Sequence, residues 1–447
     1  MRRIKRRRSE FLTALQQGGA PVRLSCFFMG FGHLRAGQWG KAAGYFLLQL
    51  AAGAFFLLPG GGLYRIGMLP SLGSQPQREV WDDALGVYVY TPGDRSQLIL
   101  LYGIVCIALL FGFFLCWRSS VIGGYRALIA RKRGGAFPSL LGEVQMLGDE
   151  KVHRSLMFLP AACLFVFTII PLLYMMSMAF TDFSQVNDKL VLFDWVGLRN
   201  FLSVFDPNAA IGRQFWGVLG WTLVWAFLAT FLNFILGLLL AMLINRPEIR
   251  FPGLFRGVLS VTAAVPQFVS LLVLRSMFQP QGIINRLLPG DYPFLQDAVW
   301  ARTLVILVNL WVGIPFTVLQ VTGVLKNIPG QLYEAARLDG AGAGKVFRHI
   351  TLPYMLFVMG PYLITQFTAN INNFNVIWLF TRGEPIAVGD SAGKTDLLVT
   401  WLYKLSVDQQ RYNLAAVIGI FTFLILSAVS LLTYRRTAAY KNEEGFR

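Results

Sequence analysis

The 447-residue chain has little charge and few side chains suited to catalysis or metal binding. Charged residues make up 14% of it and hydrophobic residues 55%, a composition too apolar for an ordinary soluble protein and typical of a membrane protein. The four cysteines form no CxxC pair, and no second histidine or cysteine stands at metal-ligand spacing from His33. The sequence therefore predicts no catalytic residues and no metal site.

Nucleotide-binding loops are also missing. The glycine-rich stretch Glu334–Pro353 contains Gly344-Lys345, but a phosphate-binding loop would need serine or threonine at position 346 and glycine at position 339. Those positions hold Val346 and Asp339, and the dinucleotide pattern GxGxxG fails at Lys345. We therefore predict no cofactor in this chain and no enzymatic activity of its own.

Basic residues outnumber acidic residues and give a net charge of +17. They are scattered between apolar runs and do not cover one folded face, which argues against a nucleic-acid-binding protein.

Eight apolar runs are long enough, or nearly so, to cross a bilayer as helices of about 20 residues. The sequence thus predicts an all-α, polytopic membrane protein with eight transmembrane helices in a cell (inner or plasma) membrane. The runs lie at 42–58, 97–117, 156–180, 216–244, 257–278, 303–325, 354–380 and 413–434.

The distribution of lysine and arginine predicts the orientation, because short cytoplasmic loops retain positive charge. With the N-terminus inside, 27 of the 40 basic residues fall in cytoplasmic segments. Both termini and the segment 326–352 are then predicted to be cytoplasmic.

Within that segment the sequence indicates a short helix, a turn and a second short helix. Gln331–Leu338 have good helix propensity, and Gly340 stands where a left-handed C-terminal cap is expected. Lys345–Ile350 form the second helix, and Pro353 is predicted to begin the next membrane helix. Leu332, Ala335 and Ala336 share a shallow face suited to docking, although a plain cytoplasmic connector is the alternative.

In this segment the chain resembles the permeases of ABC importers, whose EAA signature reads EAA-x3-G-x9-I-x-LP. Every fixed position of the signature matches with the same spacing. The resemblance implies a coupling loop that docks on a cytoplasmic ATPase, which would bind ATP-Mg in place of this chain. The ATPase-coupling residues that it implies are Glu334, Ala335, Ala336, Asp339, Gly340, Ile350, Leu352 and Pro353.

Further segments resemble sugar permeases of the MalF type, which have eight spans and the type I ABC importer fold. They are Ala179–Phe183, Val196–Phe201, Ile371–Phe374 and Thr395–Val399. The resemblance divides the chain into residues 1–154, with the basic tail, an interfacial segment and the first two spans, and residues 155–447, the transmembrane core with helices 3–8. Only about 35 residues, 181–215, follow the third span, where some relatives insert a large domain.

Asparagines occur well inside the predicted sixth and seventh spans. Polar side chains are rare there, because an unpaired amide in lipid is costly. Hydrogen bonds between helices are one explanation. The resemblance implies the other, a sugar site. Phe316 stands where a tyrosine is expected and Ala369 where an aromatic residue is expected, which makes the implied pocket roomier and less polar. The implied site consists of Asn309, Val312, Gly313, Phe316, Ala369, Asn370 and Asn373.

We therefore predict a permease subunit of an ATP-driven ABC importer for an oligosaccharide, with maltose or maltodextrin as the first expectation and another di- or oligosaccharide as the alternative. The implied partners are a second EAA-type permease (MalG-like), an ATPase dimer (MalK-like) and an extracytoplasmic sugar-binding protein. A secondary transporter is disfavoured because almost no acidic residues lie inside the spans. An intramembrane enzyme is also disfavoured, because the predicted spans contain no constellation of His, Glu, Asp or Ser residues suited to catalysis.

Overall fold

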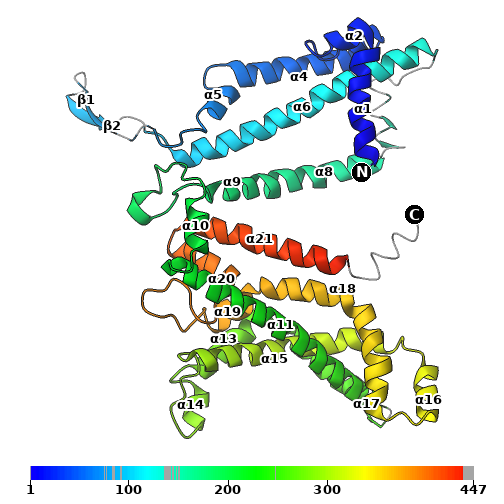
Figure 1. Ribbon diagram of the computed structural model, residues 1–447, viewed down its shortest axis with the longest axis vertical. Helices are drawn as coiled ribbons and strands as arrows, with labels where there is room; N and C mark the ends of the chain where they lie inside the picture. Colours follow the sequence, from blue (N-terminus) through cyan, green and yellow to red (C-terminus); the bar gives the residue numbers. More distant parts are fainter. Residues whose placement is uncertain are drawn as a thin grey trace. The chain divides into compact units, whose positions relative to one another are not determined.

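The computed structural model describes residues 2–435 except 75, 77, 83–85, 91–92, 135–141, 143–144, 147, 150–151 and 247. The chain forms two compact units, one up to Gly197 and the other from Leu198 onward. Both units are built of helices, as Figure 1 shows. The resemblance placed the domain boundary between residues 154 and 155, where the similarity to the permease family begins. That boundary stays a prediction.

The first unit contains a hairpin and three long apolar helical segments. The strands β1 (Glu79–Asp82) and β2 (Val87–Tyr90) pair antiparallel and are a small departure from the all-α prediction. Its helices are α1 (Arg2–Gln17), α2 (Gly19–Leu24), α3 (Phe31–Arg35), α4 (Trp39–Leu57), α5 (Gly62–Gly67), α6 (Ser96–Lys132), α8 (Val152–Leu164) and α9 (Ile170–Met178). A π turn, Phe165–Ile169, joins α8 to α9, and a 3₁₀ turn covers Val186–Asp188.

The second unit carries the remaining helices around the central pair α11 and α15. Its helices are α10 (Arg199–Phe205), α11 (Ala210–Ile244), α12 (Pro252–Ala264), α13 (Gln267–Phe278), α14 (Ile283–Leu287), α15 (Ala298–Leu325), α16 (Gly330–Leu338), α17 (Ala343–Val346), α18 (Leu352–Ile371), α19 (Phe374–Phe380), α20 (Leu398–Tyr403) and α21 (Tyr412–Tyr434). Two π turns, Phe347–Thr351 and Lys404–Asp408, follow α17 and α20.

Seven helical segments among the described residues are long and apolar enough to cross a membrane, and they match seven of the eight predicted runs. The eighth, 257–278, is apolar but is not one helix. It is split into α12 and α13 at Val265-Pro266, where both residues adopt extended ψ angles. A residue before proline avoids the helical region, and proline cannot donate the next helical hydrogen bond, so the chain opens here. The predicted fifth span is therefore an apolar run made of two helices, and the structure remains compatible with eight spans.

Two other predicted boundaries also differ. The seventh run breaks after Ile371, and Asn373 starts α19 by accepting a hydrogen bond from the backbone N–H of Val376 at 3.2 Å. The second short helix of the glycine-rich segment does not stop before Pro353, because residues 343–371 form one continuous helical segment. Its π turn ends just before Leu352-Pro353, where the missing proline N–H deprives a carbonyl of its usual partner.

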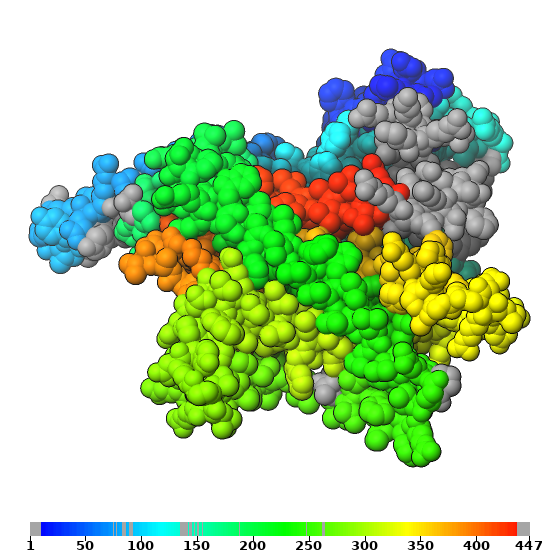
Figure 2. All heavy atoms as spheres, turned by 60° about the horizontal axis from the view of Figure 1, so that its bottom comes forward, coloured from blue at the N-terminus to red at the C-terminus, as the bar shows by residue number. Residues whose placement is uncertain are grey.

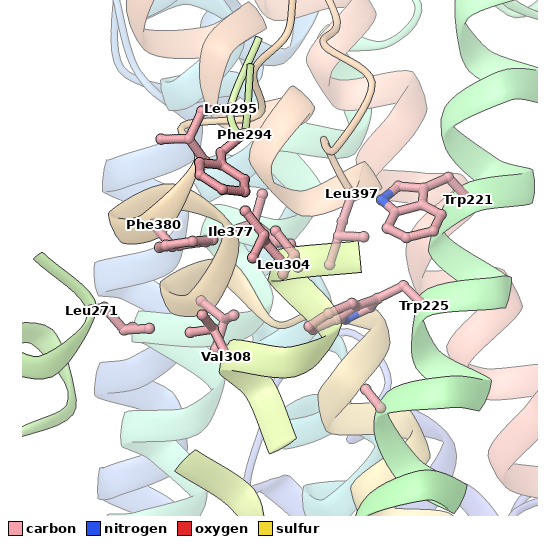
Figure 3. Close-up of a cluster of buried hydrophobic side chains, with 13 residues drawn as sticks. Trp221, Trp225, Leu271, Phe294, Leu295, Leu304, Val308, Ile377, Phe380 and Leu397 are labelled. Carbon is pink, nitrogen blue, oxygen red and sulfur yellow. The ribbon is translucent and has the colours of Figure 1, made fainter. Parts of the chain in front are cut away.

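The core of the second unit consists of two apolar clusters on α11 and α15. The first, the outer cluster, contains Trp221 and Trp225, which point from α11 toward Leu397 and Leu304 in Figure 3. The second, the inner cluster, joins the C-terminal half of α11 to α15 and α18 through residues such as Phe234 and Met359.

Two glycines allow α11 and α15 to approach closely. A Cβ on Gly237 would lie 2.6 Å from Cγ2 of Thr317, and a Cβ on Gly313 would lie 2.7 Å from the amide of Asn233. Small residues allow such close packing between membrane helices, where burial of apolar surface gives little drive for association.

Candidate functional site

A cavity of about 520 Å³ lies within the second unit, bounded by α11, the break between α12 and α13, α15 and α18. Its size falls in the range of about 300–1,000 Å³ that small-molecule sites occupy. The lining residues that the argument below uses are Thr230, Asn233, Gln267, Asn309, Val312, Gly313, Phe316, Gln366, Asn370 and Asn373.

The cavity forms a polar layer between the two apolar clusters. On α15 the last buried residue of the outer cluster is Val308 and the first of the inner cluster is Val318. The residues of α15 that line the cavity lie between these two positions. The same order holds on α11, where Ala229 belongs to the outer cluster and Phe234 to the inner one. The polar groups on α11 and α15 therefore lie away from the ends of those helices, whereas Gln267 begins α13 and Asn370 lies at the end of α18.

The structure brings six of the seven predicted sugar-contacting residues together around this cavity. Ala369 is the exception: it lies on α18 but is exposed and does not line the cavity. The six that do are Asn309, Val312, Gly313, Phe316, Asn370 and Asn373. Their binding role stays a prediction.

Two of these asparagines also hold helices together. The Nδ2 of Asn370 donates to Oγ1 of Thr230 on α11 at 3.0 Å, and its carbonyl accepts from Nε1 of Trp225 at 3.0 Å. Asn373 caps α19 and lies 3.4 Å from the Oδ1 of Asn370. The interhelical explanation of the amides thus applies to Asn370, whereas Asn309 has no such bond: its Nδ2 is buried without a partner in the described chain.

Sequence reasoning missed several polar side chains of the lining, Asn233, Gln267 and Gln366 among them. The signal was available, because Asn233 and Gln366 also interrupt apolar runs, and Pro266-Gln267 falls inside another. At Gly313 the missing side chain leaves room for the Asn233 amide.

The glycine-rich segment forms a protruding elbow. Gly340 follows α16 with a φ of +71°, as predicted, and the N–H of Ala341 donates to the Ala336 carbonyl at 2.9 Å. The segment, yellow in Figure 2, projects at the right of that view. Leu338 is 89% exposed at the end of α16.

The eight predicted coupling residues divide into two groups in the elbow. Ile350 and Leu352 pack against the inner cluster, together with Tyr333, whose hydroxyl lies 3.1 Å from Oγ1 of Thr351. Glu334, Ala335, Asp339, Gly340 and Pro353 are exposed, and Ala336 is half-buried. One group therefore attaches the elbow to the membrane helices, and the other is accessible for docking.

A buried ion pair supports the loop between α19 and α20, outside the long helices. The Nζ of Lys404 donates to Oδ2 of Asp396 at 2.6 Å, and Asp396 also accepts from the N–H of Gly393 at 2.7 Å and from the hydroxyl of Thr400 at 2.8 Å. Burial raises the pKa of the Asp396 carboxyl above its ordinary value, and the Lys404 ammonium opposes that rise. The sequence analysis did not predict this pair.

Several helices long and apolar enough to cross a membrane, a polar cavity between them and a protruding elbow are features of a multi-pass membrane permease. Residues 233–438 match the family described as the inner membrane component of binding-protein-dependent transport systems. The chain belongs to this family, whose members are transport permeases and not enzymes.

Two curated relatives support the assignment, and one solved structure shares the fold. The galactooligosaccharide permease protein GanP of Bacillus subtilis (strain 168) is 32% identical over 93% of this chain and 96% of its own length. The maltodextrin permease protein MdxF of the same organism is 34% identical over 79% of this chain and 85% of its own length. A crystal structure of a bacterial alginate ABC transporter with a pentasaccharide-bound periplasmic protein shares the fold, with a TM-score of 0.53 and 20% identity over 65% of this chain and 96% of its own.

Proposed function

We propose that this chain is one of the two membrane subunits of an ATP-driven importer, and that an oligosaccharide passes through the described cavity. The cavity is the observation that carries the proposal. Amide groups gather there between two apolar layers, and amides pair well with sugar hydroxyls because they both donate and accept hydrogen bonds. Phe316 adds a ring on which a pyranose can stack.

Maltose or maltodextrin is the proposed substrate, with another di- or oligosaccharide such as a galactooligosaccharide as the alternative. The names of the relatives support both sugar classes. Phe316 lacks the hydroxyl of the tyrosine expected at its position, which makes the cavity less polar, so a sugar longer than a disaccharide or differently linked is favoured. The described lining holds no carboxylate for ion coupling, which speaks against a secondary transporter.

The proposed complex needs three kinds of partner. A second permease (MalG-like) would complete the membrane pathway, and a MalK-like ATPase dimer would bind ATP-Mg and dock on the elbow around Gly340. An extracytoplasmic binding protein would deliver the sugar. Both termini are proposed to be cytoplasmic, on the side of the elbow.

Replacing Asn309 with alanine tests the site. Because its Nδ2 has no partner among the described residues, truncation breaks no bond that the fold shows, but it removes a donor for a sugar hydroxyl. Losing one buried hydrogen bond costs about 1–3 kcal/mol, so oligosaccharide uptake by the reconstituted transporter should fall by about tenfold or more.

Gln320 provides a matched control on the same helix. Its Oε1 is also buried without a partner in the described chain, but Gln320 does not line the cavity. Gln320→Ala should leave uptake near the wild-type level. If Asn309→Ala transports maltose, maltodextrins and galactooligosaccharides at the wild-type rate, the sugar site lies elsewhere.

A further inference from the structure

We propose that Asn233, on α11, is a specificity-determining residue that recognises one hydroxyl group of the transported oligosaccharide together with Asn309. This inference rests on the proposed function. It goes beyond the predicted sugar-contacting residues, which lie on α15, on α18 and in the turn after α18.

The orientation of the Asn233 amide is set by its own helix. Its Nδ2 donates to the carbonyl of Ala229, one turn earlier, at 2.7 Å. The opposite atom, Oδ1, is therefore directed away from that carbonyl, and it is buried without a hydrogen-bond partner in the described part of the chain. A buried polar atom with no partner is uncommon in folded proteins and calls for a ligand or solvent group.

Gly313 leaves the space beside α15 that the amide occupies. A Cβ at this position would lie 2.7 Å from both Nδ2 and Oδ1 of Asn233, closer than any real side chain permits. The glycine therefore gives the amide its place beside α15. Asn309 lies four residues before Gly313, so the two positions share one face of the helix, one turn apart.

The two asparagines offer complementary groups. Asn233 has a buried acceptor without a partner among the described residues, Oδ1, Asn309 has a buried donor without one, Nδ2, and both residues line the same cavity. A sugar hydroxyl donates one hydrogen bond and accepts others, so a single hydroxyl placed between the two amides would satisfy both atoms. A ligand lacking that hydroxyl would leave both amides unpaired and should be rejected.

Monodeoxy analogues of the transported oligosaccharide test this pairing in the complete reconstituted transporter. For the wild type, one analogue in the set should show an uptake efficiency lower by about tenfold or more, because its missing hydroxyl leaves buried groups unpaired. In Asn233→Leu, which has a side chain of similar size but no acceptor, the efficiency ratio between the parent sugar and that analogue should fall to about one. Discrimination against the other analogues should persist.

Asn245→Leu is the matched control. Asn245 makes the same bond to the carbonyl one turn earlier on α11, Nδ2 to Ala241 at 2.7 Å, and lies outside the cavity. It also bonds to Thr322 and Arg256, so its substitution breaks more contacts than that of Asn233. Its substitution should leave the full pattern of discrimination in place. If the transporter with Asn233→Leu fails to assemble, the efficiency ratio between the parent sugar and the analogue can be measured for Asn233→Ala, which has a smaller side chain.

The outcomes separate the two claims. A wild-type transporter that takes up no oligosaccharide overturns the proposed function and this inference with it. A wild type that transports the sugar, combined with Asn233 variants that keep the full discrimination, overturns the role of Asn233 alone. A loss of discrimination confined to one hydroxyl supports it.

Discussion

Gly340→Val is expected to abolish most transport while the complex still assembles. Gly340 has a φ of +71°, a conformation that costs an L residue about 1–2 kcal/mol, and a β-branched side chain more. The elbow would relax to another backbone geometry and turn α16 away from its direction relative to α17. We expect uptake and sugar-stimulated ATP hydrolysis by the reconstituted complex to fall by about tenfold or more.

The glycines of the elbow supply their own control. A Cβ at either Gly340 or Gly342 would meet no atom within 4 Å, but Gly342 has a φ of −69°, which any residue adopts. Gly342→Val should thus retain far more activity than Gly340→Val. Gly340→Asn should restore part of the loss, because asparagine tolerates the left-handed region. Equal activity in the two valine variants would refute a conformational role for Gly340.

Asp396→Ala is expected to produce the largest loss of stability. It would leave the Lys404 ammonium, whose side chain is 8% exposed, without its counter-charge and without the hydrogen bond at 2.6 Å. Breaking one side of a buried ion pair costs about 3–5 kcal/mol, which corresponds to a fall in Tm of about 10 °C. Thermal unfolding of the purified complex in detergent measures the change.

The same loop offers a surface pair for comparison. Asp390 and Lys394 lie 3.9 Å apart with half-exposed side chains, and such pairs contribute about 0–1 kcal/mol. Asp390→Ala should therefore shift Tm by no more than about 2 °C, although it also loses a 3.1 Å hydrogen bond from Gln214. A Tm for Asp396→Ala no lower than that of Asp390→Ala would contradict a stabilising role for the buried pair.

Hydropathy predicted the apolar runs well, because a segment that crosses a bilayer must be long and apolar regardless of which helices it packs against. It did not predict where helices break. Pro315 and Pro361 lie inside the continuous helices α15 and α18, whereas Pro266 separates α12 from α13. The residue type is the same in all three cases. The outcome depends on whether neighbouring groups satisfy the carbonyls that proline leaves free, and that information lies in the tertiary structure.

The candidate site was predictable in part, because the apolar requirement of a membrane helix makes polar residues in it conspicuous. Asparagines at mid-depth are costly, so Asn309, Asn370 and Asn373 were recognisable from the sequence, and Asn233 carried the same signal without being chosen. The Asp396–Lys404 pair gave no comparable signal, since two opposite charges eight positions apart in a loop are ordinary. Their burial appears only when the loop folds around Gly383, where a side chain would overlap the pair.

The contact between Gly313 and the Asn233 amide also links the histories of two positions on different helices. Even an added methyl group at 313 would occupy space that the amide fills, so a change at 313 is tolerable only after residue 233 becomes smaller or the helices separate. Among descendants of a common ancestor, the two positions should therefore be substituted together, with the change at 233 preceding the change at 313. A change of residue 313 is therefore expected only in lineages in which residue 233 has already changed.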